Sequence, residues 1–189
     1  MSGDRERAQF AADELAIVLS HYDLGPIAEI TPFKRGSRKS PKVFIKSGRG
    51  AFVLKRRAPG RDDPLKVAFC HLIQNHLARQ GFPVPHLIPT ARHKHSMVRY
   101  RQWTYELFRY VAGESYDQST SETQDAGRVL GLCHKLLADY QTDYEPPLVG
   151  YHDSESVRSS LNHVPTRLKG HDSVHGREAE LLGLSLIHI

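Results

Sequence analysis

Three segments with the composition of β-strands follow one another between residues 27 and 56, and this succession most restricts the possible folds. The segments IAEITPF, KVFIKS and AFVLKR alternate or cluster apolar and β-branched residues. A basic loop joins the first two, and Gly48–Gly50 forms a link of hairpin length between the second two. Helical periodicity precedes them over residues 4–22 and follows them from Pro64, and HSMVRY and WTYELFRYV suggest two more strands. This order predicts an α+β fold in which a helix packs across an antiparallel sheet.

The pattern becomes mainly helical after a change of composition at AGESYDQSTSET. This change places a domain boundary near residues 111–116, so that residues 1–112 and 113–183 form two parts. Ser119 and Glu122 resemble a capping box that opens a helix, and a further helix interrupted by Pro165 is expected over residues 157–168. The first of these helices has an apolar face made of Ala126, Val129, Leu130, Cys133, Leu137 and Tyr140.

Composition disfavours membrane-spanning and secreted classes. The sequence has no apolar run of about 18 residues, and charged residues occupy the N-terminal stretch where a signal peptide needs an apolar core. Cys70 and Cys133 both lie in predicted helices, which favours buried, reduced thiols. We therefore expect a cytoplasmic protein with no membrane partner.

The net charge of +5 at pH 7 indicates an anionic partner: a nucleic acid, an anionic membrane face or a phosphorylated ligand. The twelve histidines are scattered along the chain. His71 and His76, for example, fall on different faces of a predicted helix, so we expect no metal site from them.

The stretch GAFVLKRR at Gly50–Arg57 runs an apolar segment directly into three cations. Alternation in a strand places Val53 and Lys55 on one face and Leu54 and Arg56 on the other. An apolar residue beside an ammonium group suits ATP, because adenine favours dispersion contacts and the phosphates favour a cation. A surface lysine that extends its amine into solvent is the alternative.

A basic loop precedes this strand and lies opposite it in the predicted hairpin. Gly36, flanked by small serines, allows backbone N–H groups to approach phosphate oxygens, and the neighbouring cations supply a positive field. A solvated charged turn explains the loop equally well when it is considered alone. The cations are Lys34, Arg35, Arg38, Lys39 and Lys42.

Several of these motifs occur together in one known family. FVLKRR as a lysine strand, GFPVP at Gly81–Pro85 after a helix, ELFRYVAG as a hinge and AGRVLGLCHKLL as the helix beyond it resemble the aminoglycoside phosphotransferase and choline kinase superfamily. The resemblance covers residues 24–137 and implies a protein-kinase-like small lobe of five antiparallel strands plus a helix, followed by the first helices of a large lobe. It also implies an enzyme that transfers a phosphoryl group from ATP, with Mg²⁺, to a hydroxyl of a small molecule.

The resemblance also implies roles for single residues. Lys55 is expected to contact the α- and β-phosphates, and Arg35, Gly36 and Ser37 to cover them. The Arg109 carbonyl and the Val111 amide are expected at the adenine edge. The side chains of Val53 and Phe108 are expected to line the ring pocket.

One position departs from the family pattern. Family members often carry a glutamate on the small-lobe helix that holds the strand lysine, and this sequence has Cys70 and His71 there. A histidine anchors an ammonium group less well than a carboxylate does, because the two repel when the imidazole is protonated. The sequence therefore leaves the acidic partner of Lys55 open.

The residues of phosphoryl transfer are missing from the sequence. A His-x-Asp-x-x-x-x-Asn loop is required, and the nearest match, HYDLGPIA at His21–Ala28, ends in alanine and precedes the lysine strand. No Asp-Phe-Gly follows to bind Mg²⁺. The final LSLIHI, residues 184–189, resembles translated adapter sequence, so we expect a fragment that is inactive by itself.

Nucleic-acid binding, a scaffold role and another class of kinase are the alternative functions. Five cations in the loop permit nucleic-acid binding, but the loop lacks interleaved aromatic residues that would stack on bases, which disfavours it. A pseudokinase-like scaffold of natural length remains open. A lipid or protein kinase also remains open, although GFPVP and YELFRYVAG favour the small-molecule branch.

Overall fold

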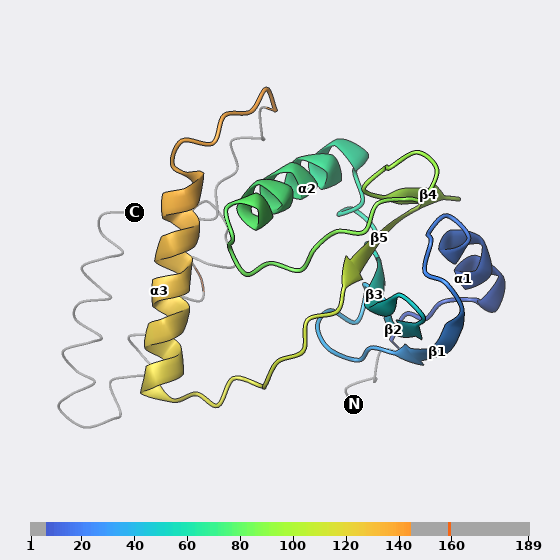
Figure 1. Ribbon diagram of the computed structural model, residues 1–189, viewed down its shortest axis with the longest axis horizontal. Helices are drawn as coiled ribbons and strands as arrows, with labels where there is room; N and C mark the ends of the chain where they lie inside the picture. Colours follow the sequence, from blue (N-terminus) through green and yellow to red (C-terminus); the bar gives the residue numbers. More distant parts are fainter. Residues whose placement is uncertain (1–6, 145–158, 160–189) are drawn as a thin grey trace. The chain divides into compact units, whose positions relative to one another are not determined.

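The computed structural model describes residues 7–144 and residue 159 (Figure 1). The chain divides into two compact units, residues 1–144 and residues 145–189. All of the described residues except Ser159 belong to the first unit. The predicted helix over residues 157–168 and the terminal residues 184–189 lie outside the described residues, apart from Ser159. The predicted division after residue 112 stays a prediction.

A five-stranded antiparallel sheet forms the centre of the described unit. Its strands are β1 (Ile27–Pro32), β2 (Lys42–Ser47), β3 (Gly50–Arg56), β4 (Val98–Tyr100) and β5 (Trp103–Arg109). The spatial order β1-β2-β3-β5-β4 makes β3 and β5 neighbours although 46 residues separate them in the chain, between Arg56 and Trp103. The sheet confirms the α+β fold that the succession of strands predicts.

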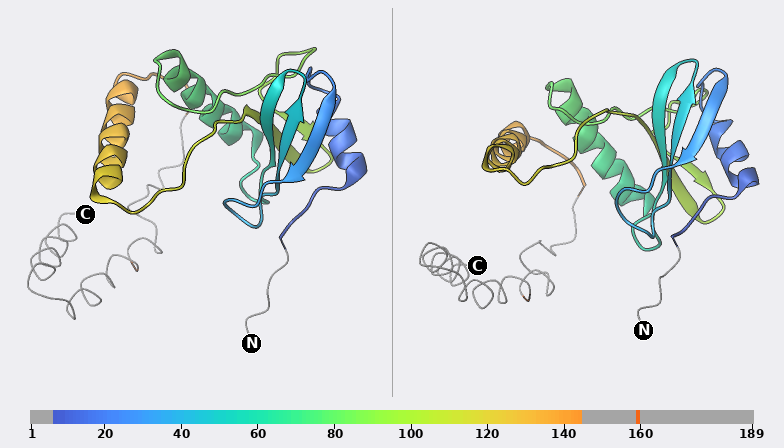
Figure 2. Two further views of the ribbon diagram at one scale, coloured as in Figure 1. Left: turned by 60° about the horizontal axis from the view of Figure 1, so that its bottom comes forward. Right: turned by 90° about the horizontal axis from the view of Figure 1, so that it is seen from below.

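Two helices lie on opposite sides of this sheet, as both views of Figure 2 show. On one side is α1 (Ala12–Leu19), whose Val18 and Leu19 join a buried cluster with Ile45, Leu54 and Leu107 of the strands. On the other side is α2 (Pro64–Arg79), which begins at Asp63, whose carboxylate accepts a hydrogen bond from the Lys66 amide at 2.9 Å. The fold therefore leaves one sheet face packed on α1 and directs the other toward α2.

The first helix is shorter than its sequence pattern predicts. Among the described residues it begins at Ala12, where the Glu14 carboxylate accepts a hydrogen bond from the Ala11 amide at 3.1 Å. Residues before it bond elsewhere, since the Ala8 amide donates to the Arg38 carbonyl at 3.1 Å. A tertiary contact with the basic loop thus replaces the expected first turns.

The buried face of α2 includes a polar residue. Val67, His71 and Leu77 are buried, whereas Leu72 is 53% exposed. His71 is directed toward the sheet, where it bonds Glu106 of β5. Cys70 on this helix is exposed, and Cys133, further along the chain, is half-buried, so the predicted burial of both thiols is wrong, although both are free as expected.

The helix α3 (Thr120–Leu137) follows the extended segment after β5. Ser119 caps it by accepting from the Glu122 amide at 3.2 Å, but the Glu122 carboxylate bonds the Asp117 amide rather than completing the expected box. Leu130 is 56% exposed on this helix. None of the described helices has the length and apolar content that a membrane crossing requires.

Candidate nucleotide-binding face

The pairing of β3 with β5 brings three of the predicted site residues, Val53, Lys55 and Phe108, together on one face of the sheet. Val53 lies directly opposite Phe108, and Lys55 lies directly opposite Glu106. Phe52 and Leu54 of β3 point to the opposite face and belong to the buried cluster. Val53 and Lys55 therefore share one face of β3, and Leu54 lies on the other, as the alternation predicts.

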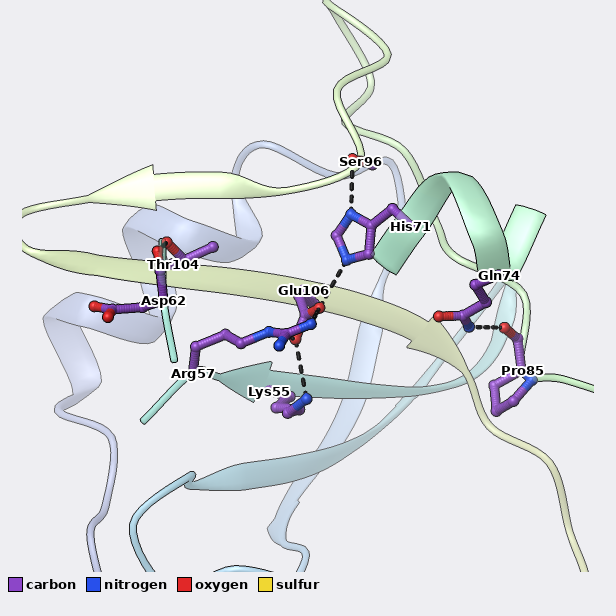
Figure 3. Close-up of polar contacts among 9 residues, drawn as sticks. All are labelled: Lys55, Arg57, Asp62, His71, Gln74, Pro85, Ser96, Thr104 and Glu106. Carbon is purple, nitrogen blue, oxygen red and sulfur yellow. Dashed lines mark hydrogen bonds and ion pairs between the residues drawn. The ribbon is translucent and has the colours of Figure 1, made fainter. Parts of the chain in front are cut away.

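Glu106 is the centre of this face (Figure 3), and its side chain has no exposed surface. Lys55 reaches it with its ammonium nitrogen 3.1 Å from Oε2. Arg57 forms a bidentate pair, with Nε 2.8 Å from Oε2 and a terminal nitrogen 2.6 Å from Oε1. His71 contacts the same Oε1 through Nε2 at 2.7 Å. One carboxylate thus joins β3, β5 and α2.

These contacts determine the charge of Glu106. Burial by itself raises the pKa of a carboxyl group, but hydrogen bonds from His71 and Arg57 and the charge of Lys55 outweigh it and lower the pKa of Glu106 to about 2. The group is therefore an anion at neutral pH. A buried anion of this kind requires partners of opposite charge, and Lys55 and Arg57 supply them.

His71 is fixed at both ring nitrogens. Its Nδ1 lies 2.8 Å from the Ser96 hydroxyl, and its Nε2 faces Glu106. An ionised carboxylate can only accept, so Nε2 carries the hydrogen. In the neutral imidazole, Nδ1 then accepts the hydrogen bond that the Ser96 hydroxyl donates. The ring orientation follows from these two bonds.

The middle cation of the run, Arg56, points to the opposite face of the sheet. It pairs with Glu14 of α1 at 2.6 Å, and Tyr105 donates its hydroxyl to the same oxygen at 2.7 Å. All three cations that follow the apolar run therefore contact carboxylates. Alternation along the strand sends Lys55 and Arg57 to Glu106 and Arg56 to Glu14.

The basic loop leads into β2 at Lys42, at one end of the candidate face. Gly36 has φ of +80°, a conformation that glycine adopts without strain, and a Cβ at this position would lie 3.0 Å from the Lys42 ammonium. The Lys42 ammonium donates hydrogen bonds to the Arg35 carbonyl at 3.1 Å and to the Ser40 carbonyl at 3.4 Å. Lys42 thereby ties the two sides of the loop together.

Lys42 is also the direct cross-strand neighbour of Lys55. Partial burial, followed by the nearby charges of Lys55 and Arg7, lowers the pKa of Lys42. Two ammonium groups on adjacent strands of one face form an electropositive area beside the loop. An anion placed there would relieve the repulsion between them.

The far end of the face is apolar and lies beside the segment after β5. The rings of Phe44 and Tyr110 meet edge to face with centroids 5.0 Å apart. The Arg109 amide donates to the His86 carbonyl and the Tyr110 amide to the Ala51 carbonyl, and the Val111 side chain is 62% exposed. The structure thus orders the backbone on which the predicted adenine-edge roles of Arg109 and Val111 depend.

Metal ligands are not gathered in this region. Within residues 7–144 and at residue 159, no three His, Cys, Asp or Glu side chains cluster as a metal ion would require.

Comparison with known protein families identifies the family. The sequence profile of the phosphotransferase enzyme family matches residues 29–179, which include the whole candidate face. The chain belongs to this phosphotransferase family. A search among curated proteins gave no match.

Solved structures of small-molecule kinases have the same fold as this phosphotransferase-family chain. An aminoglycoside phosphotransferase from Alicyclobacillus acidocaldarius aligns over 97% of the chain with a TM-score of 0.59 and 19% identity. An amicoumacin kinase in complex with AMP-PNP, Ca²⁺ and its antibiotic aligns over 84% with a TM-score of 0.61 and 14% identity. A spectinomycin phosphotransferase in complex with ADP and spectinomycin aligns over 87% with a TM-score of 0.55 and 12% identity.

The chain spans about half the length of these structures: it covers 51% of the first, 51% of the second and 49% of the third. At these identities the likeness establishes the fold, and the roles of individual residues must come from the geometry of this chain.

Two residues of the face are missing from the sequence-based site, namely Glu106 and Arg57. A signal for Glu106 was present. Once Val53 and Phe108 are placed on one ring pocket, antiparallel pairing requires that the residue two positions after Val53 face the residue two positions before Phe108. Those residues are Lys55 and Glu106. Arg57 lies beyond the end of β3, where pairing gives no such rule.

Proposed function

We propose that this chain binds ATP on the face formed by β2, β3 and β5, as part of an enzyme that phosphorylates a small molecule. The carrying observation is Lys55, an ammonium group 27% exposed, held by a buried carboxylate and aligned on β3 with Val53, which faces Phe108. An apolar surface followed by a fixed cation matches the order of adenine and phosphates in ATP.

The geometry supports a division of labour along the face. Lys55 would donate to the α- and β-phosphates, because an ammonium group has three donors and Glu106 accounts for one of them. Arg35, Gly36 and Ser37 would cover the phosphates, with the loop kept closed by Lys42. Val53 and Phe108 would contact the adenine ring, while the Arg109 carbonyl and the Val111 amide would bond its edge.

The bound metal would be Mg²⁺, which bridges phosphate oxygens and neutralises their charge. The acceptor would be a hydroxyl of a small molecule such as an aminoglycoside or a metabolite. This assignment is supported by the family and by the antibiotic-modifying kinases that share the fold. We place the protein in the cytoplasm, where ATP is supplied.

Binding can be tested with Lys55→Met, a substitution that removes the charge and retains most of the side chain. We expect AMP-PNP with Mg²⁺ to bind the unmodified chain, and the variant to bind about tenfold more weakly or worse, because a charge-assisted contact is lost. Calorimetric titration measures both affinities.

Lys66→Met provides the matched control, since Lys66 is an exposed lysine in the first turn of α2. Its affinity should equal that of the unmodified chain. An unchanged affinity in Lys55→Met, or no binding by the unmodified chain, would refute the proposed function.

A further inference from the structure

Glu106 receives contacts of unequal length and exposure. Arg57 and His71 approach it at 2.6 to 2.8 Å, whereas Lys55 approaches at 3.1 Å. Lys55 is also the most accessible partner, with 27% of its side chain exposed against 19% for Arg57 and 3% for His71. Arg57 and His71 therefore mainly fix the position of the Glu106 carboxylate. Lys55 pairs with a carboxylate that these two residues already hold.

This arrangement leaves Lys55 oriented but not saturated. A lysine side chain loses rotamer entropy when it is fixed, and pairing with a preorganised carboxylate incurs that loss before a ligand arrives. The contact with Glu106 uses one of the three donors of the ammonium group. A carboxylate on β5 can thus position the lysine for an anion without occupying all of its donors.

The helix contributes to the anchor indirectly. The position on α2 from which a carboxylate was expected holds His71, and its Nε2 bonds Glu106 instead of Lys55. Thr104 adds a second link between β5 and the segment that leads into α2, because its hydroxyl donates to the Asp62 carbonyl at 3.0 Å. The carboxylate that pairs with Lys55 therefore lies on β5 and not on α2, and α2 contacts this carboxylate through His71.

We propose that Glu106 is the positioning residue for Lys55 and that His71 couples α2 to it. This inference rests on the proposed function, since it assumes that Lys55 contacts the nucleotide phosphates. Glu106 itself does not touch the nucleotide. Its effect on nucleotide affinity must therefore pass through Lys55.

A double-mutant cycle on the full chain tests this dependence. Glu106→Gln should lower the affinity for AMP-PNP with Mg²⁺ about tenfold, and should leave the affinity for adenosine, which has no phosphates, unchanged. In the Lys55→Met background the same substitution should change AMP-PNP affinity by less than about twofold, because the group through which it acts is gone.

Relocating the charge provides a rescue that a merely structural role would not give. In the double variant His71→Glu/Glu106→Gln the carboxylate stands on α2, within reach of the site that Nε2 now occupies. We expect its AMP-PNP affinity to return to within about threefold of the unmodified chain. Thermal unfolding of each variant separates loss of binding from loss of fold.

The two proposals fail differently. If Lys55→Met binds normally, the proposed function is wrong. If Lys55→Met is weak while folded Glu106→Gln binds normally, or if the two losses add in the cycle, or if the relocated carboxylate gives no rescue, the positioning role is wrong and the proposed function stands.

A measurement on the unmodified chain covers the case in which Glu106→Gln does not fold. The ¹⁵N signal of the Lys55 ammonium, assigned by its loss in Lys55→Met, should be protected from exchange before nucleotide is added and should shift when AMP-PNP binds. An ammonium that exchanges as fast as exposed lysines would overturn the proposal.

Discussion

At the residue scale, Glu106 has more positive charge around it than one carboxylate can neutralise. Lys55 and Arg57 are both cations at neutral pH, and Lys42 stands beside Lys55 on the next strand. Buried ion pairs contribute little net stability compared with apolar packing, but removing one partner is costly, because the other charge stays buried. With Lys42 beside them, Lys55 and Arg57 leave an excess of positive charge on the candidate face.

The lowered pKa of Glu106 predicts a loss of stability in acid. Its pKa is about 2 in the folded chain and near 4.5 in the unfolded chain, so the contribution is complete above the unfolded value and is lost as the pH falls toward 2. The difference corresponds to about 3 kcal/mol in the free energy of unfolding. Urea unfolding between pH 6 and pH 2 should show this decline.

Glu106→Gln is the matching variant for that profile, because glutamine keeps the shape of the side chain and does not titrate. We expect it to be less stable than the unmodified chain at pH 6, and the difference to shrink as the pH falls. A difference that stays constant down to pH 2 would contradict an ionised Glu106 in the folded chain.

At the scale of elements, β3 connects the two faces of the sheet. Lys55 of this strand pairs with Glu106 on the candidate face, and the next residue, Arg56, pairs with Glu14 of α1 on the other side of the sheet. Arg56 also lies over the rings of Phe10 and Trp103, with its guanidinium carbon 5.4 and 4.8 Å from their centroids. We infer that α1 holds β3 in register from the side of the sheet opposite the candidate face.

Glu14→Gln should therefore destabilise the domain. Glu14 is buried and accepts from Arg56, Tyr105 and the Ala11 amide, so neutralising it leaves Arg56 without its carboxylate. We expect the free energy of unfolding to fall by about 3 kcal/mol, as for other buried pairs that lose one partner. Urea denaturation measures this change.

The neighbouring Asp13→Asn is the matched control. Asp13 lies on the same helix and pairs with Arg101 at 3.3 Å, but both side chains are more than half exposed, at 59% and 58%. Exposed pairs contribute about 0 to 1 kcal/mol, so this variant should be close to the unmodified chain. Equal losses in the two variants would show that burial of Glu14 is not the cause.

At the scale of the whole molecule, the chain belongs to the phosphotransferase family and spans about half the length of the solved structures it matches. We predict that residues 1–189 bind nucleotide without transferring its γ-phosphate, because the printed sequence has no His-x-Asp-x-x-x-x-Asn loop after the lysine strand. ADP release from ATP, with an aminoglycoside as acceptor, should equal the background rate.

The Lys55→Met variant defines that background. Turnover by the unmodified chain that exceeds the rate of Lys55→Met would contradict the prediction, since it would require a base and metal ligands outside the expected motif. A rate equal to that of the variant would support the predicted absence of phosphoryl transfer.

The sequence by itself determined the elements and the two faces of β3, because periodicity and the pairing of apolar with charged residues are local properties of the chain. The shared face of Val53 and Lys55 and the loop at Gly36 were predicted in this way, whereas Phe108 was predicted from the family resemblance. The tertiary structure alone decided which carboxylate meets which cation. Glu14 and Glu106 lie 42 and 51 residues from Arg56 and Lys55, and the rotation of α2 that brings His71 to Glu106 depends on packing between elements. Contacts of that separation depend on how the sheet and helices come together, which no local pattern records.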